Sequence, residues 1–213
     1  SEEAGLTFAS LAEDALADEK GCIHSSIFPH LHALPPVPVV AVAVGIILHA
    51  PFSFLYHWHY ACKLAPGYAR IDHWSRRLDH SFIHVISACM SYGTSGSWDY
   101  FLANLMFNAD CIYRQFKPRV RPRMNKIRIL ISIIAYTIPI LRRGETVLFC
   151  ELWAIFALCG WLFAKYPIGG YSHSAFHAVI ALAPPLLMQA ACHLLASKEQ
   201  IQVAARCAVL AGK

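Results

Sequence analysis

The stretch Pro38–Tyr60 reads PVVAVAVGIILHAPFSFLYHWHY and contains no Asp, Glu, Lys or Arg. A helix of about 20 apolar residues is long enough to cross the hydrocarbon core of a bilayer. The length and apolar character of this stretch therefore predict a membrane-spanning helix. Pro51 should bend that helix shortly before its end, because proline cannot donate a backbone hydrogen bond.

The composition of the whole chain agrees with a membrane protein. Of its 213 residues, 57% are hydrophobic and only 15% are charged, whereas a typical soluble domain is about 25% charged. A globular protein of this length has too little interior to bury so much apolar surface. The composition therefore disfavours a soluble domain, a disordered chain and a collagen-like chain.

Five further apolar segments extend this pattern, so the predicted fold is all-α: a polytopic transmembrane helix bundle with six spans. These segments cover His80–Ser97, Trp98–Tyr113, Ile127–Leu141, Val147–Ala164 and Ser172–Ala196. The pair Pro184-Pro185 should kink the last helix or end its regular part. The chain then divides into a lead-in over residues 1–36, acidic at first and then proline-containing, a bundle over 37–197 and a short tail over 198–213.

Basic residues mark the expected sides of the membrane. Three alternate loops of the six-helix arrangement share one side and carry most of the lysines and arginines: Lys63, Arg70, Arg76, Arg77, Arg114, Lys117, Arg119, Arg121, Arg123, Lys126, Arg128 and Lys165. Cytoplasmic loops are enriched in Lys and Arg, so this side should be cytoplasmic and the lead-in and tail should face the lumen or outside. Because the basic run 114–128 lies between two apolar segments, nucleic acid is not an expected partner.

The cysteines give no sign of a covalent framework. There are eight, at irregular spacing and without a CxxC pair. Most lie inside apolar runs, where cysteine behaves as a small hydrophobic residue. The sequence therefore predicts neither a disulfide framework nor a zinc ribbon.

Three short polar motifs interrupt the apolar segments. They are Ser53-Phe-Leu-Tyr-His57, Leu78-Asp79-His80-Ser81 and His173-Ser-Ala-Phe-His177. Helical residues four apart share one face, so Ser53 pairs with His57 and His173 with His177. The expected topology also places all three motifs at the cytoplasmic level of the bilayer, where they could meet.

Two histidines at i and i+4 plus a third histidine form a typical catalytic zinc set, in which the fourth position is left for water. Asp79 could orient that water or act as its general base, and Ser53 could hydrogen-bond the aspartate, the water or a developing oxyanion. His80 is a candidate outer-shell group beside Asp79. His84, which pairs with His80 on one helix face, is the rival metal ligand. His49 falls near mid-membrane or the far side and is expected to be a packed or interfacial polar residue.

The order Ser53-xxx-His57, Asp79, His173-xxx-His177 resembles the CREST superfamily of membrane proteins over roughly Pro38–Ala196. That group includes the alkaline ceramidases, the progestin and adipoQ receptors and the bacterial hemolysin III proteins, and the branch stays open. The resemblance implies a seven-helix bundle, with one helix ahead of this chain. It also implies a Zn²⁺ site near the cytoplasmic leaflet, with His57, His173 and His177 as ligands, Asp79 and Ser53 as catalytic residues, and hydrolysis of lipid amides.

Three functions follow as hypotheses. The first is an integral-membrane zinc-dependent hydrolase of lipid amide (ceramide-like) or ester bonds, with a zinc-bound water as nucleophile. The second is a receptor or assembly protein of the adipoQ receptor or hemolysin III type with a structural zinc closed by a fourth protein ligand. The third, a channel, finds few polar lining residues. Membrane lipids, as substrate or ligand, are the expected partners, and the oligomeric state stays open.

Overall fold

The computed structural model describes residues 22, 33–60, 63–64 and 67–211, so most of the expected lead-in lies outside the described residues. Two compact units make up the chain: Pro38–Leu194, and Ser1–Val37 together with Leu195–Lys213. Every regular element in the described ranges is a helix, which confirms the all-α fold for that part of the chain.

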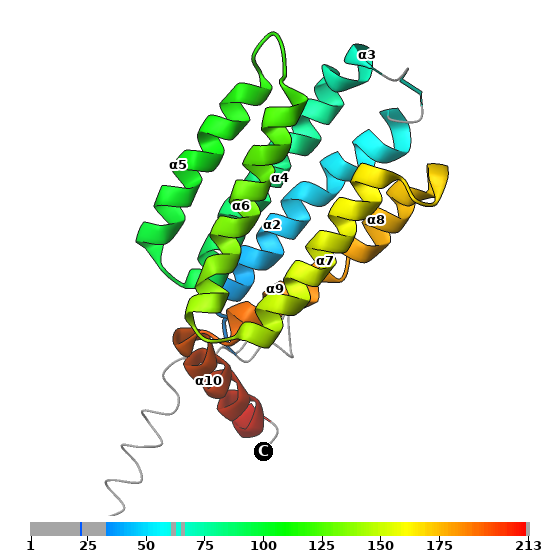
Figure 1. Cartoon of the computed structure of the whole chain (residues 1–213). Helices are drawn as coiled ribbons and strands as arrows, with labels where there is room; N and C mark the ends of the chain where they lie inside the picture. The colour runs from blue at the N-terminus through cyan, green and yellow to red at the C-terminus, as the bar shows by residue number, and fades with distance from the viewer. Residues whose placement is uncertain (1–21, 23–32, 61–62, 65–66, 212–213) are drawn as a thin grey trace, which may run out of the picture. The chain divides into compact units, whose positions relative to one another are not determined.

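The helices follow one another with short connections (Figure 1). In chain order they are α2 (Val37–Phe54), the π-helical segment η1 (Leu55–Tyr60), α3 (Tyr68–Ile71), α4 (Trp74–Ser95), α5 (Trp98–Gln115), α6 (Pro122–Arg142), α7 (Thr146–Lys165), the 3₁₀ turn η2 (Gly169–Tyr171), α8 (Ser172–Ile180), α9 (Ala183–Cys192) and α10 (Leu195–Ala211). The first, third and fifth expected helices match these bounds within two residues, whereas the second and fourth begin six and five residues earlier than expected and the last is broken.

Four helical stretches in the described part are long and apolar enough to cross a membrane. They are Val37–Tyr60, Pro122–Arg142, Thr146–Lys165 and Gly169–Cys192. Large apolar side chains such as Ile47, Val147 and Trp161 are exposed on them, as expected for surfaces that face lipid. A multi-pass membrane protein is therefore plausible. The sequence predicts six spans, and the two that are not among these four helices are α4 and α5.

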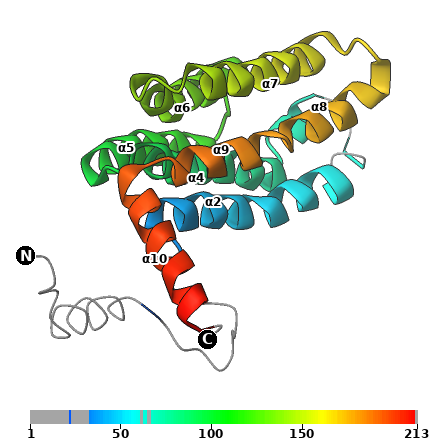
Figure 2. The same ribbon diagram turned by 90° about the horizontal axis from the view of Figure 1, so that it is seen from below.

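Helix α4 is long but polar, and it is largely buried inside the bundle. It packs against α5, α6 and α9, which lie around it in Figures 1 and 2. Its buried hydroxyls bond to the carbonyl one turn earlier, as Ser81 Oγ does to Arg77 O (2.7 Å) and Ser87 Oγ to Ile83 O (2.7 Å). Because the backbone of α4 satisfies these hydroxyls and the neighbouring helices shield them, polar side chains are tolerated on this helix.

The contact between α2 and α4 depends on small residues. Gly45 and Gly93 lie at the crossing, and a Cβ on Gly93 would meet Val42 Cγ2 at 2.4 Å and Pro38 O at 3.1 Å. In membranes, small residues allow two helix backbones to approach closely, and that packing replaces the hydrophobic driving force. The crossing fixes α2, which carries one of the candidate ligands, against α4, which carries Asp79.

Gly93→Ala should destabilise the protein, because the new methyl overlaps a β-branched side chain and a carbonyl that have little room to move. We expect a loss of about 1–3 kcal/mol, measured as a lower midpoint of thermal unfolding in detergent. The matched control is Gly160→Ala on α7, whose added Cβ meets nothing within 4 Å. Since alanine favours helix over glycine, this control should be neutral or stabilising, and an equal loss in both variants would contradict the close crossing.

The last expected helix is broken at the site of its two prolines. Helix α8 ends at Ile180 and α9 begins at Ala183, with proline in its first turn. This confirms that Pro184-Pro185 interrupts the regular helix, because neither residue can donate to the preceding turn. The break limits α8 to the short segment that carries His173 and His177.

Arg143 connects three elements at the end of the bundle opposite those histidines. Its guanidinium donates to Thr94 O on α4, Ala190 O on α9 and Glu145 Oε1 (2.8 Å). Glu145 Oε2 also lies 3.3 Å from His193 Nδ1. Partial burial raises the pKa of the Glu145 carboxyl, but hydrogen bonds and charge from Arg143 and His193 outweigh it and leave that pKa below its ordinary value.

Glu145 should therefore stabilise the fold in a pH-dependent way. A carboxyl whose pKa is lowered on folding contributes stability above its unfolded pKa, about 4.3, and loses it as the pH falls through the folded pKa. We expect Glu145→Gln to lower the midpoint of thermal unfolding at pH 7 and to match wild type at pH 3. Glu151→Gln, an exposed carboxylate on α7, is the control; a pH-independent difference at Glu145 would exclude the ionic contribution.

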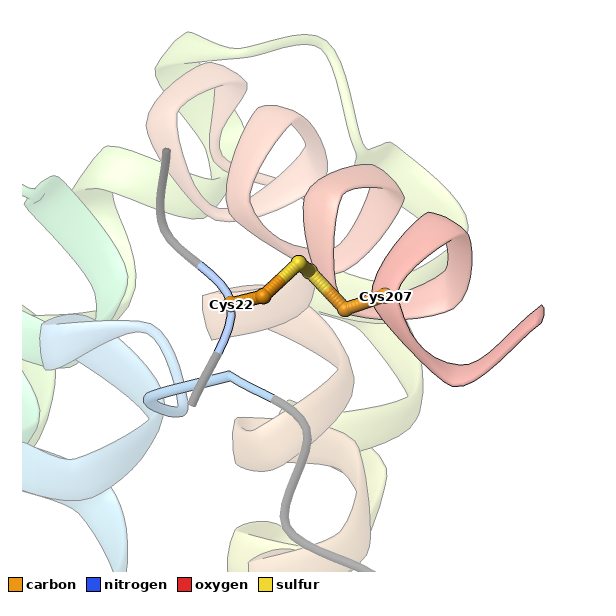
Figure 3. Close-up of a disulfide and its surroundings, with 2 residues drawn as sticks. All are labelled: Cys22 and Cys207. Carbon is orange, nitrogen blue, oxygen red and sulfur yellow. A yellow bond between two sulfur atoms is a disulfide. The ribbon is translucent and has the colours of Figure 1, made fainter. Parts of the chain in front are cut away.

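The second unit contains a disulfide that the sequence did not predict. Cys22 bonds to Cys207 on α10, with Cα atoms 5.5 Å apart and 185 residues between them in sequence (Figure 3). Gln200 of the same helix donates to Leu34 O at 3.1 Å. Helix α10 covers most of residues 198–213, the expected tail. Spacing alone gives no signal for a pairing over such a distance.

Candidate metal centre

His57 lies where α2 changes its winding. The chain leaves α-helical geometry after Phe54 and continues as a π-helix over Leu55–Tyr60, four residues beyond Pro51, which lacks a backbone donor. Single π-helical turns are frequent at functional sites because they redirect side chains. Here the turn directs the His57 Nδ1 atom to within 2.9 Å of His173 Nε2.

His173 and His177 come from the first two turns of α8. As the i, i+4 spacing predicts, their rings lie on one face, with the two Nε2 atoms 3.2 Å apart. The ring centroids of His57 and His177 are 4.5 Å apart. The three predicted ligands, 116 and 120 positions apart in the chain, are therefore together in the structure, and one nitrogen of each lies within 4.8 Å of the others.

The geometry of these three nitrogens fits a metal ion. With zinc–nitrogen bonds of about 2.0–2.1 Å in a tetrahedron, neighbouring ligand nitrogens lie about 3.3 Å apart. The observed separations of 2.9 and 3.2 Å are close to that value. Imidazole suits several transition metals, so the three histidines could hold a metal ion whose identity this geometry leaves open.

Asp79 faces the same centre from α4. Its side chain is almost fully buried, and its Oδ2 lies 3.7 Å from His57 Nε2, the ring nitrogen directed away from the other two histidines. Its other oxygen, Oδ1, lies 3.3 Å from His49 Nε2. The carboxylate is therefore held between two histidines of α2 that are two helical turns apart, at the edge of the candidate metal centre.

His49 is the site residue that the sequence analysis missed. We expected a packed or interfacial residue, whereas the structure places its ring against Asp79. The sequence spacing could have indicated this contact, because His49, Ser53 and His57 follow one another at intervals of four residues and therefore share one helix face. Ser53 is half-buried on α2 one turn before His57, and its catalytic role stays a prediction.

His80 and His84 lie outside the group of three histidines. His80 Nδ1 lies 2.5 Å from Asn125 Nδ2 on α6, and His84 Nδ1 lies 2.8 Å from Asn108 Oδ1 on α5. Ser132 also donates to Asn108 Oδ1, at 2.9 Å. Successive residues on a helix point in different directions, so Asp79 faces the histidines of α2 while His80 faces α6. The structure therefore gives these two candidates a role in joining α4 to its neighbours.

Aromatic rings cover one side of the centre. The Phe176 ring stacks on that of His173 with centroids 5.8 Å apart, and Phe163 of α7 lies 5.9 Å from Phe176 and 6.3 Å from His173. All three histidines of the candidate centre are half-buried.

No protein-family model, curated protein or solved structure matches this chain.

Proposed function

We propose that this protein is an integral-membrane zinc hydrolase that cleaves lipid amide or ester bonds. The observation that carries the proposal is the three-histidine centre beside a buried aspartate, at one end of a bundle whose outer surface is apolar. Three protein ligands are the number that a catalytic zinc site uses, whereas structural sites use four. The motif order resembles the CREST superfamily, whose alkaline ceramidases hydrolyse lipid amides, and this resemblance supports the same function.

His57 Nδ1, His173 Nε2 and His177 Nε2 would hold the metal, which when bound polarises the scissile carbonyl and activates the attacking water. Asp79 would act as the general base that accepts a proton from the attacking water and returns it to the leaving group. His49, in contact with the other oxygen of Asp79, fixes the direction of the carboxylate. Ser53, on the same face of α2, would donate to the developing oxyanion.

A lipid amide has its polar junction close to the membrane surface and its chains in the hydrocarbon core. The candidate centre lies at the ends of α2 and α7 and at the start of α8, which would be the interfacial level if these helices span the bilayer. Exposed aromatic side chains near it, such as Phe54 and Trp58, suit that level. The substrate would therefore reach the centre from within the membrane.

Two independent features support a cytoplasmic position for the centre. The loops on its side carry most of the Lys and Arg residues. The disulfide supports the same orientation, because Cys22 precedes the first span and Cys207 follows the last, and disulfides persist in oxidising compartments outside the cytoplasm. With an even number of spans between them, both cysteines lie on one side, and the end of α2 that carries His57 lies on the other.

This orientation predicts opposite labelling of two exposed lysine positions. In intact cells, with Cys150 replaced by Ser, an impermeant maleimide should label Lys198→Cys but not Lys117→Cys. Both lysines are exposed, and the proposed topology would put them on opposite sides of the membrane. Permeabilised cells, in which both positions should react, are the control, and labelling of Lys117→Cys alone in intact cells would reverse the orientation.

The receptor or assembly function is supported by one specific observation. Asp79 is a buried carboxylate 3.7 Å from His57 Nε2, and on moving past the His57 ring to the side of Nδ1 it would become a fourth ligand and close the site. A closed site is typical of structural zinc. Unfolding on metal removal, in a chain that hydrolyses no N-acyl lipid when zinc is bound, would favour this alternative.

The experiment that tests the proposed function is turnover of N-acyl lipids by the purified chain in mixed micelles. We expect release of fatty acid that stops after chelation and returns when zinc is restored. A soluble acyl amide without a long chain should be a poor substrate, because the binding energy of the chain is then lost. Turnover that persists in fully metal-free protein would reject a metal-dependent hydrolase.

A further inference from the structure

Lys126 is a basic side chain one aromatic ring away from the candidate metal centre. It lies in the first turns of α6, and its Nζ is 4.8 Å from the centroid of the Phe163 ring. Phe163 in turn lies against His173 and Phe176. An ammonium group over a ring face gains a cation–π attraction and keeps its N–H donors available to a further partner.

The position of Lys126 is fixed by the residue before it. Asn125 is buried, lies 2.5 Å from His80 Nδ1 on α4 and accepts a hydrogen bond from Gln115 on α5. His80 directly follows Asp79 in α4, so adjacent residues of this helix contact His57 of the candidate centre and Asn125, the residue before Lys126. Lys126 and the candidate centre therefore lie at the same end of the bundle.

Lys126 has no acidic partner among the described residues. The exposed charged side chains near it in sequence are all basic: Lys117, Arg119 and Arg121 in the loop before α6, and Arg123 in the first turn of α6. An uncompensated positive charge beside a site attracts and orients an anionic ligand. Its complement would be a negative group a short distance from the bond that the centre cleaves.

From this geometry we propose that the lipid bound at the candidate metal centre carries an anionic, phosphate-class headgroup, and that Lys126 binds that headgroup. This inference rests on the proposed function, because it names the substrate class of the same centre. The phosphate would lie at Lys126, outside Phe163, while the amide or ester lies at the three histidines. Lys126 is thus a specificity-determining residue.

Lys117 is a matched control that tests whether any lysine of this basic region attracts an anion equally well. Lys117 is also exposed and also lies over a ring, with its Nζ 5.3 Å from the centroid of Tyr113. It follows α5, however, which lies on the opposite side of the bundle from α8 in Figure 1. The two lysines therefore share charge and type of contact, and differ in their position relative to the centre.

The test is equilibrium binding of dodecyl phosphate to the full chain in dodecyl maltoside micelles, followed by isothermal titration against protein-free micelles. We expect wild type and Lys117→Gln to bind equally, and Lys126→Gln to bind about five- to tenfold more weakly, the effect of one charged contact. His173→Ala/His177→Ala should keep the binding. Inorganic phosphate at the same concentration should compete poorly, because it lacks the chain.

Four results would overturn the proposal. The first two are no binding of dodecyl phosphate to wild type, and equal weakening of binding by Lys117→Gln and Lys126→Gln. The third is loss of binding in the double histidine variant, which would place the phosphate on the metal. The fourth is full competition by inorganic phosphate, which would indicate a site for free phosphate. Turnover of phosphorylated against unphosphorylated N-acyl lipids is the second measurement, and Lys126→Gln should remove the preference for the phosphorylated lipid. If no lipid is hydrolysed but dodecyl phosphate binds as described, the proposed function fails and the headgroup site stands.

Discussion

Replacing His173 and His177 together by alanine should reduce bound zinc from about one ion per chain to nearly none, since catalytic zinc needs three protein ligands and this variant leaves one. In the structure these two Nε2 atoms are 3.2 Å apart, and His173 Nε2 is 2.9 Å from His57 Nδ1. Each imidazole therefore contributes to one centre. The measurement is elemental analysis of protein purified in detergent, with zinc supplied during growth.

The control for this loss is His193→Ala. His193 is a partly exposed histidine whose neighbour is Glu145, at the opposite end of the bundle. This variant should keep the wild-type zinc content. Unchanged zinc in the double variant, with the same thermal unfolding as wild type, would contradict a metal site at these histidines.

Asp79→Asn should retain the metal and lose turnover by about a hundred- to ten-thousandfold, the range for removal of a general base. The asparagine keeps the shape of the side chain but cannot accept the proton of water. The separation of 3.7 Å between Asp79 Oδ2 and His57 Nε2 exceeds that of a normal hydrogen bond. We therefore expect little change in metal affinity, measured beside fatty-acid release.

Variants of His49 test whether this residue positions the Asp79 carboxylate, separately from the role of Asp79 as a base. His49→Gln preserves a donor toward Asp79 Oδ1, whereas His49→Leu removes it, so the leucine variant should lose more turnover at equal zinc content. Loss of both zinc and turnover in Asp79→Asn would instead make the carboxylate a ligand and favour the structural-zinc alternative. Full hydrolytic activity in Asp79→Asn would exclude its role as base.

Much of the site could be predicted because two properties can be read directly from the sequence: the helical spacing of polar residues and the number of spans between motifs. The HxxxH spacing placed His173 and His177 on one face, and counting spans brought Ser53-xxx-His57 and Asp79 to the same level. The π-helical turn at Leu55–Tyr60 could not be predicted, since it follows from how the residues after Pro51 pack against the rest of the bundle. It nevertheless determines which nitrogen of His57 faces the other two histidines.

For the polar helix α4, the bounds expected from hydropathy differ from those in the structure. The expected second helix started at His80, but α4 starts at Trp74, where His73 caps it by accepting from the Ser75 backbone N–H. Its first turns contain Arg76 and Arg77, which we expected in the loop before the helix. Arg77 is satisfied by distant groups, the carbonyls of Gln115 and Lys117 at 2.8 Å. Such long-range partners, like the Cys22–Cys207 bond, leave no local pattern in the sequence.

The most direct test of the central claim is the zinc K-edge X-ray absorption spectrum of the wild-type protein. A catalytic zinc at the three histidines predicts three imidazole nitrogens at about 2.0–2.1 Å from the zinc and one oxygen ligand that an added hydroxamate replaces. Folded, zinc-supplied protein that contains no metal, or a spectrum with four protein ligands and no exchangeable oxygen, would contradict a catalytic centre at His57, His173 and His177.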